Sequence, residues 1–506
     1  MSIGTKIEKL TTGSVLARNS VFNLIGQGVP LLVALIAIPL LIRGLGTDRF
    51  GVLTLAWMVI GYFSLFDLGL GRALTQLVAE KLGRGEEKEL PTLVWTALAL
   101  MFVLGLLGAI VVSVISPWLV HNVLKIPEPL QTETLNAFYS LAAAIPIVIV
   151  TAGLAGLLSA QQRFGNLNAI RIPMGIYNFL APLLVLPFSS SLFLVTTVLV
   201  IGRLVGCIVH LAFCLRAMPA LRTGFMLRYA VIKPLFHFGA WMTVTNVIGP
   251  LMIYLDRFVI GAVVSMAAVA YYATPFEMVT KLLIIPGAIL GVLFPAFAAS
   301  YAQDHDRIVQ LFARGTKYLA LLLFPMILVI TAFAHEGLQW WLGDEFAWHS
   351  TPVLQCLAIG VFINSLAQVF ITLIQGIGRP DLSAKLHFLE LPIYLPVLWW
   401  AIHHYGILGA AMAWTGRAAL DGILLFWLST RLLGGNAVLF KRMTVGMLVA
   451  LGWLLVPLSA DAFIPRAAMV LLIMVGFFFI AWVAVLAPDE RMHIKSWIGR
   501  LIGIKV

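Results

Sequence analysis

Four basic side chains stand inside apolar runs that are long enough to cross a bilayer: Arg72, Arg203, Lys281 and Arg417. A charge at the centre of a bilayer costs at least about 2.5 to 3.5 kcal/mol, so it normally faces a partner or a water-filled cavity. Cations in such places bind and neutralise anions. The four residues therefore predict a cationic, water-filled path through the protein.

Two of the four cations have an acidic residue one helical turn away. Glu277 precedes Lys281 by four residues, the favourable order for an intrahelical ion pair, and Asp421 follows Arg417 in the less favourable order. Either pair can neutralise itself and leave no charge for a ligand. The alternative is that a substrate phosphate draws Lys281 away from Glu277.

Arg203 has no acidic neighbour on its own predicted helix, which makes it the strongest candidate for binding an anion. The alternative is that Arg203 snorkels to the outer interface. Arg72 follows Asp67 by five residues, and five residues rotate a helix by about 140 degrees, so the two would not share a face. If its helix ends early, Arg72 is merely interfacial.

Membrane carboxyl groups are candidates for coupling transport to protons or cations. Glu390 lies between His387 and Pro392 with no base close by in the sequence, and its protonation could serve such coupling. The full set of ion-coupling candidates is Asp67, Glu277, Glu390 and Asp421.

Amide side chains form stripes on two predicted helices. On the first, Asn19, Asn23 and Gln27 recur every four residues, and on the tenth Asn364 and Gln368 repeat this spacing. Such stripes could line the path, or they could make hydrogen bonds between helices.

The elements that must position these residues are membrane helices. Apolar residues make up 61% of the 506 residues, charged residues 11%, and the mean hydropathy is +1.01, whereas a soluble domain carries about 25% charged residues. Windows of about 19 residues pick out fourteen spans. They lie near 19–42, 51–71, 92–116, 135–158, 169–188, 192–214, 236–256, 268–298, 316–334, 352–375, 383–402, 406–430, 443–459 and 467–487.

The basic residues outside these spans are unequally divided. Of the 33 Lys and Arg, 24 fall in the termini and alternate loops, five fall in the opposite loops, and the remaining four are the stranded cations. The rule that cytoplasmic loops are positive places both termini in the cytoplasm. The net charge of +11 is therefore mostly a topology signal, and no nucleic-acid partner is needed.

The loops and cysteines argue against several classes of site. The longest loops are too short for a catalytic domain, and Cys207, Cys214 and Cys356 lie in apolar spans, where we expect them to pack rather than bind a metal or a cofactor.

The loop 216–235 falls between two similar halves, so we predict an N-terminal lobe over 1–215, a linker over 216–235, a C-terminal lobe over 236–433 and two appended helices over 434–506. An offset of six spans gives parallel repeats, which place a substrate site between the lobes.

Short motifs resemble those of one transporter family. In the first half they are Arg18-Asn19 through Pro39-Leu40-Leu41, Gly44-Leu45-Gly46, Phe50-Gly51 and Asp67-Leu68-Gly69-Leu70. In the second half they are Leu255-Asp256-Arg257-Phe258-Val259-Ile260-Gly261 and Ala270-Tyr271-Tyr272. Together they resemble bacterial polysaccharide and O-antigen flippases of the Wzx type, in the multidrug/oligosaccharidyl-lipid/polysaccharide exporter superfamily.

The resemblance implies an all-α protein with two six-helix lobes around a central cavity and two further C-terminal helices. It implies alternating access that carries an undecaprenyl-diphosphate-linked oligosaccharide across the bacterial inner membrane, a monomeric state, and partners among membrane lipids, the polysaccharide polymerase and the chain-length machinery. Two alternatives remain: a multidrug exporter of the same superfamily with an acid-dominated site, and a membrane glycan polymerase or ligase, which usually needs a larger outer loop.

Overall fold

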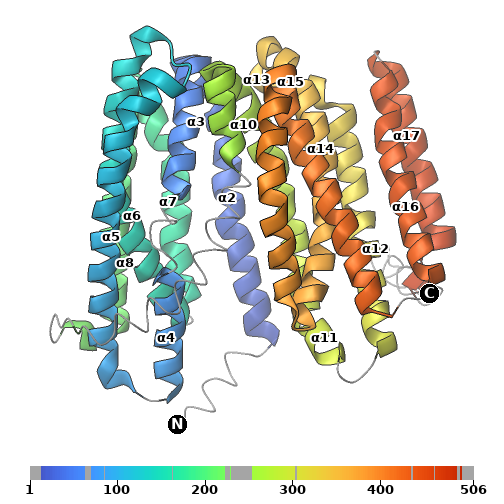
Figure 1. The fold of residues 1–506 in the computed structure, drawn as a ribbon, viewed down its shortest axis with the longest axis horizontal. Coiled ribbons are helices and arrows are strands. Elements are labelled where there is room, and N and C mark those ends of the chain that lie inside the picture. The colour runs from blue at the N-terminus through green and yellow to red at the C-terminus, as the bar shows by residue number, and fades with distance from the viewer. Residues whose placement is uncertain are drawn as a thin grey trace, which may run out of the picture. The chain divides into compact units, whose positions relative to one another are not determined.

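The structure is a computed structural model that describes residues 13–62, 70–84, 86–161, 163–222, 228, 254–301, 305–434, 437–460, 462–486 and 490–492. Within these ranges the chain is built from helices joined by turns and short loops, and the described residues contain no strand (Figure 1). The chain divides into two compact units, Met1–Ala273 (unit 1) and Thr274–Val506 (unit 2).

Unit 1 is a bundle in which α6 is the central helix. Its long helices are α2 (Gly13–Leu45), α3 (Thr47–Tyr62), α4 (Leu70–Arg84), α5 (Leu90–Trp118), α6 (Glu128–Ala160), α7 (Phe164–Val185) and α8 (Leu192–Ala217). Short helical segments are η2 (Glu87–Glu89), η3 (Leu119–Val123) and η4 (Pro219–Arg222). Helix α6 packs against α3, α4, α5, α7 and α8. It therefore contacts both α7 and α8.

Small residues let these helices approach closely. A Cβ added to Gly105 on α5 would lie 2.5 Å from the Cα of Pro146 on α6, and one added to Gly51 on α3 would lie 1.9 Å from the carbonyl oxygen of Met266. Membrane helices pack by such contacts, because lipid supplies no hydrophobic driving force between them. By contrast, Ile110 and Val114 on α5 are exposed, as apolar residues that face lipid should be.

Unit 2 is arranged around α14. Helix α10 (Met266–Thr280) begins in unit 1 and ends in unit 2. The elements that follow are η6 (Lys281–Leu283), α11 (Ile284–Tyr301), α12 (His305–Ala332), α13 (Ala334–Leu342), α14 (Asp344–Gly376), α15 (Pro380–Leu432), α16 (Ala437–Leu455), η7 (Val456–Ser459), α17 (Phe463–Ile480) and η8 (Ala481–Val485). Helix α14 packs against α11, α12, α13 and α15, while α16 and α17 pack against α12.

Helix α15 is two helices joined at a sharp turn. Gly406 has φ of 58° and ψ of −137°, a conformation that L side chains rarely adopt. The arms 380–405 and 407–432 pack so closely beside this turn that a Cβ on Gly409 would lie 2.0 Å from the carbonyl oxygen of Ala401. The turn falls where the sequence predicts the loop between spans 383–402 and 406–430.

Eight helices among the described residues are long and apolar enough to cross a membrane. They are Leu90–Val123, Glu128–Ala160, Leu192–Ala217, Met266–Leu290, Asp306–Ala332, Asp344–Gly376, Phe440–Ser459 and Phe463–Val483. The prediction of an all-α polytopic membrane protein is confirmed. The count of fourteen spans, the two six-helix lobes and the domain boundaries stay predictions.

Candidate functional site

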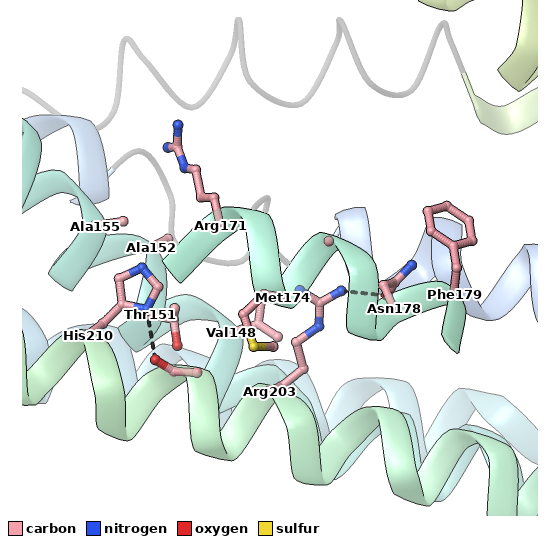
Figure 2. A pocket seen from close by; sticks show the side chains of 12 residues that line it. Val148, Thr151, Ala152, Ala155, Arg171, Met174, Asn178, Phe179, Arg203 and His210 are labelled. Carbon is pink, nitrogen blue, oxygen red and sulfur yellow. Dashed lines mark hydrogen bonds between the residues drawn. The ribbon is translucent and has the colours of Figure 1, made fainter. Parts of the chain in front are cut away.

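A cavity of about 460 Å³ lies in unit 1 among α6, α7 and α8 (Figure 2). Its lining residues are Val148, Thr151, Ala152 and Ala155 from α6, Arg171, Met174, Gly175, Asn178 and Phe179 from α7, and Arg203, Gly206 and His210 from α8. The side chains that α6 contributes are small and mostly apolar. The charged and titratable groups come from α7 and α8.

The polar side chains of α7 and α8 are arranged as two rungs. Arg203 donates a hydrogen bond from Nη2 to Oδ1 of Asn178 over 3.1 Å, which forms the first rung. On α7, Arg171 precedes Asn178 by seven residues, and on α8 His210 follows Arg203 by seven. Seven residues span about 10.5 Å, close to two turns, and the helices are antiparallel, so Arg171 and His210 form a second rung. Figure 2 shows the first rung between α7 and α8, and it shows the Arg171 side chain extending from α7 away from α8.

The cavity is electropositive. Among the residues that the structure describes, its lining contains two arginines and a histidine but no aspartate or glutamate. Arg203 is half-buried, and its hydrogen-bond partner is a neutral amide, which does not cancel its charge. A guanidinium keeps its charge in such surroundings and presents a fork of donors that matches phosphate oxygens. The arrangement can therefore hold an anion.

Besides Asn178, two titratable residues of this site are not among the site residues predicted from the sequence. Arg171 was counted among the cytoplasmic loop charges, whereas it lies two turns into α7. His210 was not singled out, although its spacing of seven residues from Arg203 places both on one helical face. That spacing is the signal from which His210 could have been found.

A second cluster of charges lies between the two arms of α15 in unit 2. Nη1 of Arg417 is 3.8 Å from Oε2 of Glu390, and Nε2 of His387 is 3.5 Å from Oδ1 of Asp421. The two carboxyl groups are buried, with side-chain exposures of 4% and 3%. The guanidinium of Arg417 also lies over the ring of Tyr394, 5.6 Å from its centroid.

This cluster corrects two expectations. Glu390 was predicted to have no base close by, which is wrong because the turn at Gly406 brings Arg417 of the other arm beside it. Arg417 was expected to pair with Asp421 on its own helix, whereas the structure pairs it with Glu390 and pairs Asp421 with His387. Spacing along one helix carries no information about partners on the opposite arm.

The predicted pair of Glu277 and Lys281 forms at the end of α10. The Lys281 ammonium lies 3.3 Å from the Glu277 carboxylate, and each side chain is 45% exposed. The contact expected from the spacing of four residues is therefore present. Whether a substrate phosphate displaces Glu277 stays a prediction.

The remaining candidates receive no assigned role. Gln368 donates a hydrogen bond to Asn364 over 3.1 Å along the same helix, α14, so a lining role for these amides stays a prediction. The other candidates, with side chains outside the described residues, are Asn19, Asn23, Gln27, Asp67 and Arg72.

Comparisons of the sequence with known proteins agree on one family. Residues 40–351 match the family model described as polysaccharide biosynthesis protein. The chain is 32% identical to a putative O-antigen transporter of Shigella flexneri over 82% of this chain and 98% of that protein. It is 22% identical to the lipopolysaccharide biosynthesis protein WzxC of Escherichia coli K12, over 85% of this chain and 82% of that protein.

The fold is that of a known transporter superfamily. The structure resembles the inward-facing conformation of a multidrug resistance MATE family transporter of the MOP superfamily, with a TM-score of 0.68. The match covers 83% of this chain and 99% of the transporter, at 15% sequence identity. A likeness at this identity concerns the fold and carries no information about the substrate.

The family predicted from the motifs is confirmed, and with it the prediction of a membrane transporter rather than an enzyme. The chain belongs to the polysaccharide biosynthesis protein family, and its fold resembles that of a MATE family transporter.

Proposed function

We propose that the protein is a flippase that moves an undecaprenyl-diphosphate-linked oligosaccharide from the cytoplasmic to the outer leaflet, for assembly of a surface polysaccharide. One observation carries the proposal: the cavity of unit 1 presents Arg171, Arg203 and His210 and has no carboxylate in its lining. A diphosphate esterified at both ends carries two negative charges at neutral pH, and such a cavity compensates them.

The sign of the cavity separates this function from the main alternative. A multidrug exporter of the same superfamily would bind cationic compounds at an acid-dominated site, and Arg171 and Arg203 would repel them. The names of relatives support the same choice, since they include a putative O-antigen transporter and, at 23% identity, a probable glycan biosynthesis flippase of Haloferax volcanii.

In the proposed mechanism the diphosphate leaves the interface and binds the guanidinium groups of the cavity. Arg203 exchanges its hydrogen bond to Asn178 for one to a phosphate oxygen. The new hydrogen bond is stronger than the bond to the neutral amide, because both of its partners are charged. The oligosaccharide is solvated by water and polar side chains, and the prenyl tail stays in lipid. Alternating access then exposes the bound diphosphate to the outer leaflet.

The other predicted site residues have supporting roles in this proposal. Lys281 and Arg72 add positive potential along the path, whereas Arg417 is paired with Glu390. The amides Asn19, Asn23, Gln27, Asn364 and Gln368 line the path. Protonation or cation binding at Asp67, Glu277, Glu390 or Asp421 biases one of the access states. Of these carboxylates, Glu390 and Asp421 are buried between the arms of α15, where a change of charge has the largest structural consequence.

The cellular setting is also part of the proposal. We place the protein in the bacterial inner membrane as a monomer with both termini in the cytoplasm, where it contacts membrane lipids and delivers substrate to the polysaccharide polymerase and the chain-length machinery. The excess of Lys and Arg in alternate loops supports this orientation.

Deleting the gene and measuring its lipid-linked intermediates tests the function. We expect undecaprenyl-diphosphate-linked oligosaccharide to accumulate, to be identified by mass spectrometry, and to disappear when the wild-type chain is restored. Arg203→Gln at normal abundance should fail to clear it. Lys385→Gln, which removes an exposed cation near the start of α15, is the matched control and should clear it. Full clearance by the Arg203 variant would overturn the cationic site, and a deletion strain without the intermediate would overturn the flippase.

A further inference from the structure

His210 is held in one tautomer by the helix that carries it. Its Nδ1 lies 2.7 Å from the carbonyl oxygen of Gly206, one turn earlier on α8, and the residue is 6% exposed. A carbonyl oxygen can only accept a hydrogen bond, so Nδ1 must carry the hydrogen. In a neutral ring Nε2 is then the nitrogen with the free lone pair, ready to accept a proton.

The second nitrogen faces the cavity. His210 is one of the lining residues, and in Figure 2 the ring nitrogen that is not bonded to Gly206 lies on the side of the ring turned toward Arg171. Arg171 is close enough to act on His210 electrostatically. A proton on Nε2 would therefore add a donor and a positive charge to the rung that Arg171 begins.

The charged and titratable groups around His210 come from α7 and α8, and α6 adds a neutral hydroxyl. On α7, Arg171 shares its rung, and on α8 Arg203 lies two turns away, with Cys207 and Cys214 on the same helix. Helix α6 contributes Thr151, a neutral hydroxyl, to the same cavity. The described residues that line this cavity include no carboxylate that could act as a permanent partner for a protonated imidazole.

A proton on His210 would be the third positive charge in the empty cavity, beside Arg171 and Arg203. A bound dianion cancels the charge of the two guanidinium groups and offers oxygens to Nε2. Each ligand then favours the other, since coupling between two binding sites is reciprocal.

We infer that His210 is a proton-linked anion ligand: the cavity binds a doubly esterified diphosphate together with one proton, taken up at Nε2. This inference rests on the proposed function and deepens it, because it names a residue that ties substrate binding to pH. It also differs from coupling through the predicted carboxylates, since the proton and the anion share one cavity.

Binding of dimethyl diphosphate to the purified full-length protein tests the inference. This probe is esterified at both ends, so its own charge stays constant between about pH 5.5 and pH 8.0, where histidine titrates. Calorimetry in buffers of different ionisation enthalpy gives the affinity and the protons taken up. We expect the affinity to fall about tenfold per pH unit on the alkaline side, with uptake approaching one proton per bound anion.

Two substitutions keep the test independent of folding. His210→Asn preserves a donor for the Gly206 carbonyl but removes the titrating nitrogen, and His210→Gln places a neutral amide near the position of Nε2. Both should bind the probe with an affinity that no longer depends on pH. His121→Gln is the matched control, because His121 is exposed and contacts Gln131 away from the cavity, and it should keep the wild-type profile.

The outcomes separate this inference from the proposed function. A pH-dependent affinity that persists in both His210 variants, or a wild-type affinity that does not change with pH, overturns the inference and leaves the cationic site standing. Arg203→Gln should weaken binding at every pH and keep the slope. Unchanged binding in that variant, or no binding by the wild type at any pH, overturns the anion site itself and the inference with it.

Discussion

The cavity of unit 1 and the α15 cluster of unit 2 each hold an arginine in apolar surroundings, but they differ in what faces it. Arg203 meets the neutral amide of Asn178, whereas Arg417 meets the buried carboxylate of Glu390. The charge of Arg203 is not compensated by its partner, whereas the charge of Arg417 is compensated by Glu390. We therefore expect a stranded cation to mark a binding site only where its immediate partner is neutral.

The same difference separates function from stability. Removing one member of a buried ion pair leaves the other buried and uncompensated, which is costly. Removing Arg203 leaves behind an amide that water in the cavity can hydrate. We therefore expect substitutions in unit 2 to act on folding and those in unit 1 to act on ligand binding.

The largest expected effect on stability is that of Arg417→Gln, which leaves Glu390 buried without its cation. We expect the free energy of unfolding to fall by about 3 to 5 kcal/mol. Guanidinium unfolding of the detergent-solubilised protein, followed by tryptophan fluorescence, measures the change. The double variant Arg417→Gln with Glu390→Gln should recover most of the loss. A single variant as stable as the wild type would remove the contrast between the two regions.

Arg203→Gln should cost much less stability, about 0.5 to 1.5 kcal/mol for the lost hydrogen bond to Asn178. It should nevertheless weaken binding of dimethyl diphosphate at every pH, because the fork of donors is gone. The same unfolding experiment and calorimetry on one protein preparation give both numbers. A stability loss as large as that of Arg417→Gln would mean that Arg203 has a structural role.

Asn178→Asp would give Arg203 an acidic partner, as Arg417 has in the α15 cluster. The substitution is nearly isosteric and places a carboxylate where Arg203 already donates a hydrogen bond over 3.1 Å. We expect affinity for the diphosphate probe to fall at least about tenfold while stability stays within about 1 kcal/mol of the wild type. Asn178→Ser, which removes the amide without adding charge, is the control and should bind. Equal affinity in the Asp variant would show that the partner of Arg203 does not decide ligand binding.

The smallest effect is expected at exposed pairs outside the membrane. Arg379 and Lys385 hold the pKa of the Asp381 carboxyl below its ordinary value, with the hydrogen bond from Arg379 as the main cause. Because the folded-state pKa is lowered, any stability it contributes is present at neutral pH and is lost only as pH falls through the acid range. Asp381→Asn should leave thermal unfolding at neutral pH unchanged. A clear drop in the unfolding temperature would show that the pairs of Asp381 stabilise the fold as buried ion pairs do.

Much of the architecture could be predicted because the hydropathy of a membrane span depends only on the residues within that span. The apolar spans and the break near Gly406 follow from composition and turn chemistry, and so does the pair of Glu277 with Lys281, whose partners are one turn apart. Arg203 could be ranked as an anion ligand because its own helix offers no acid.

The partners of Glu390 and Asp421 could not be predicted, since they lie on the opposite arm of a hairpin whose register the sequence does not reveal. Arg171 was misplaced because a cation near a helix end looks like a topology signal, and a difference of one turn decides whether it faces a loop or a cavity. Asp67 and Arg72 stay predictions.

The turn at Gly406 sets the alignment of two rows of charges that lie far from it. Arg417 follows it by eleven residues, about 16 Å along the arm, yet the pairing of Arg417 with Glu390 depends on how the two arms are aligned there. Adding one residue to either arm beside the turn would rotate everything beyond it by about 100 degrees and turn Arg417 away from Glu390. Most loop tips tolerate insertions. We expect the turn at Gly406 not to tolerate an insertion, because the added residue would change the alignment of the two arms along their whole length.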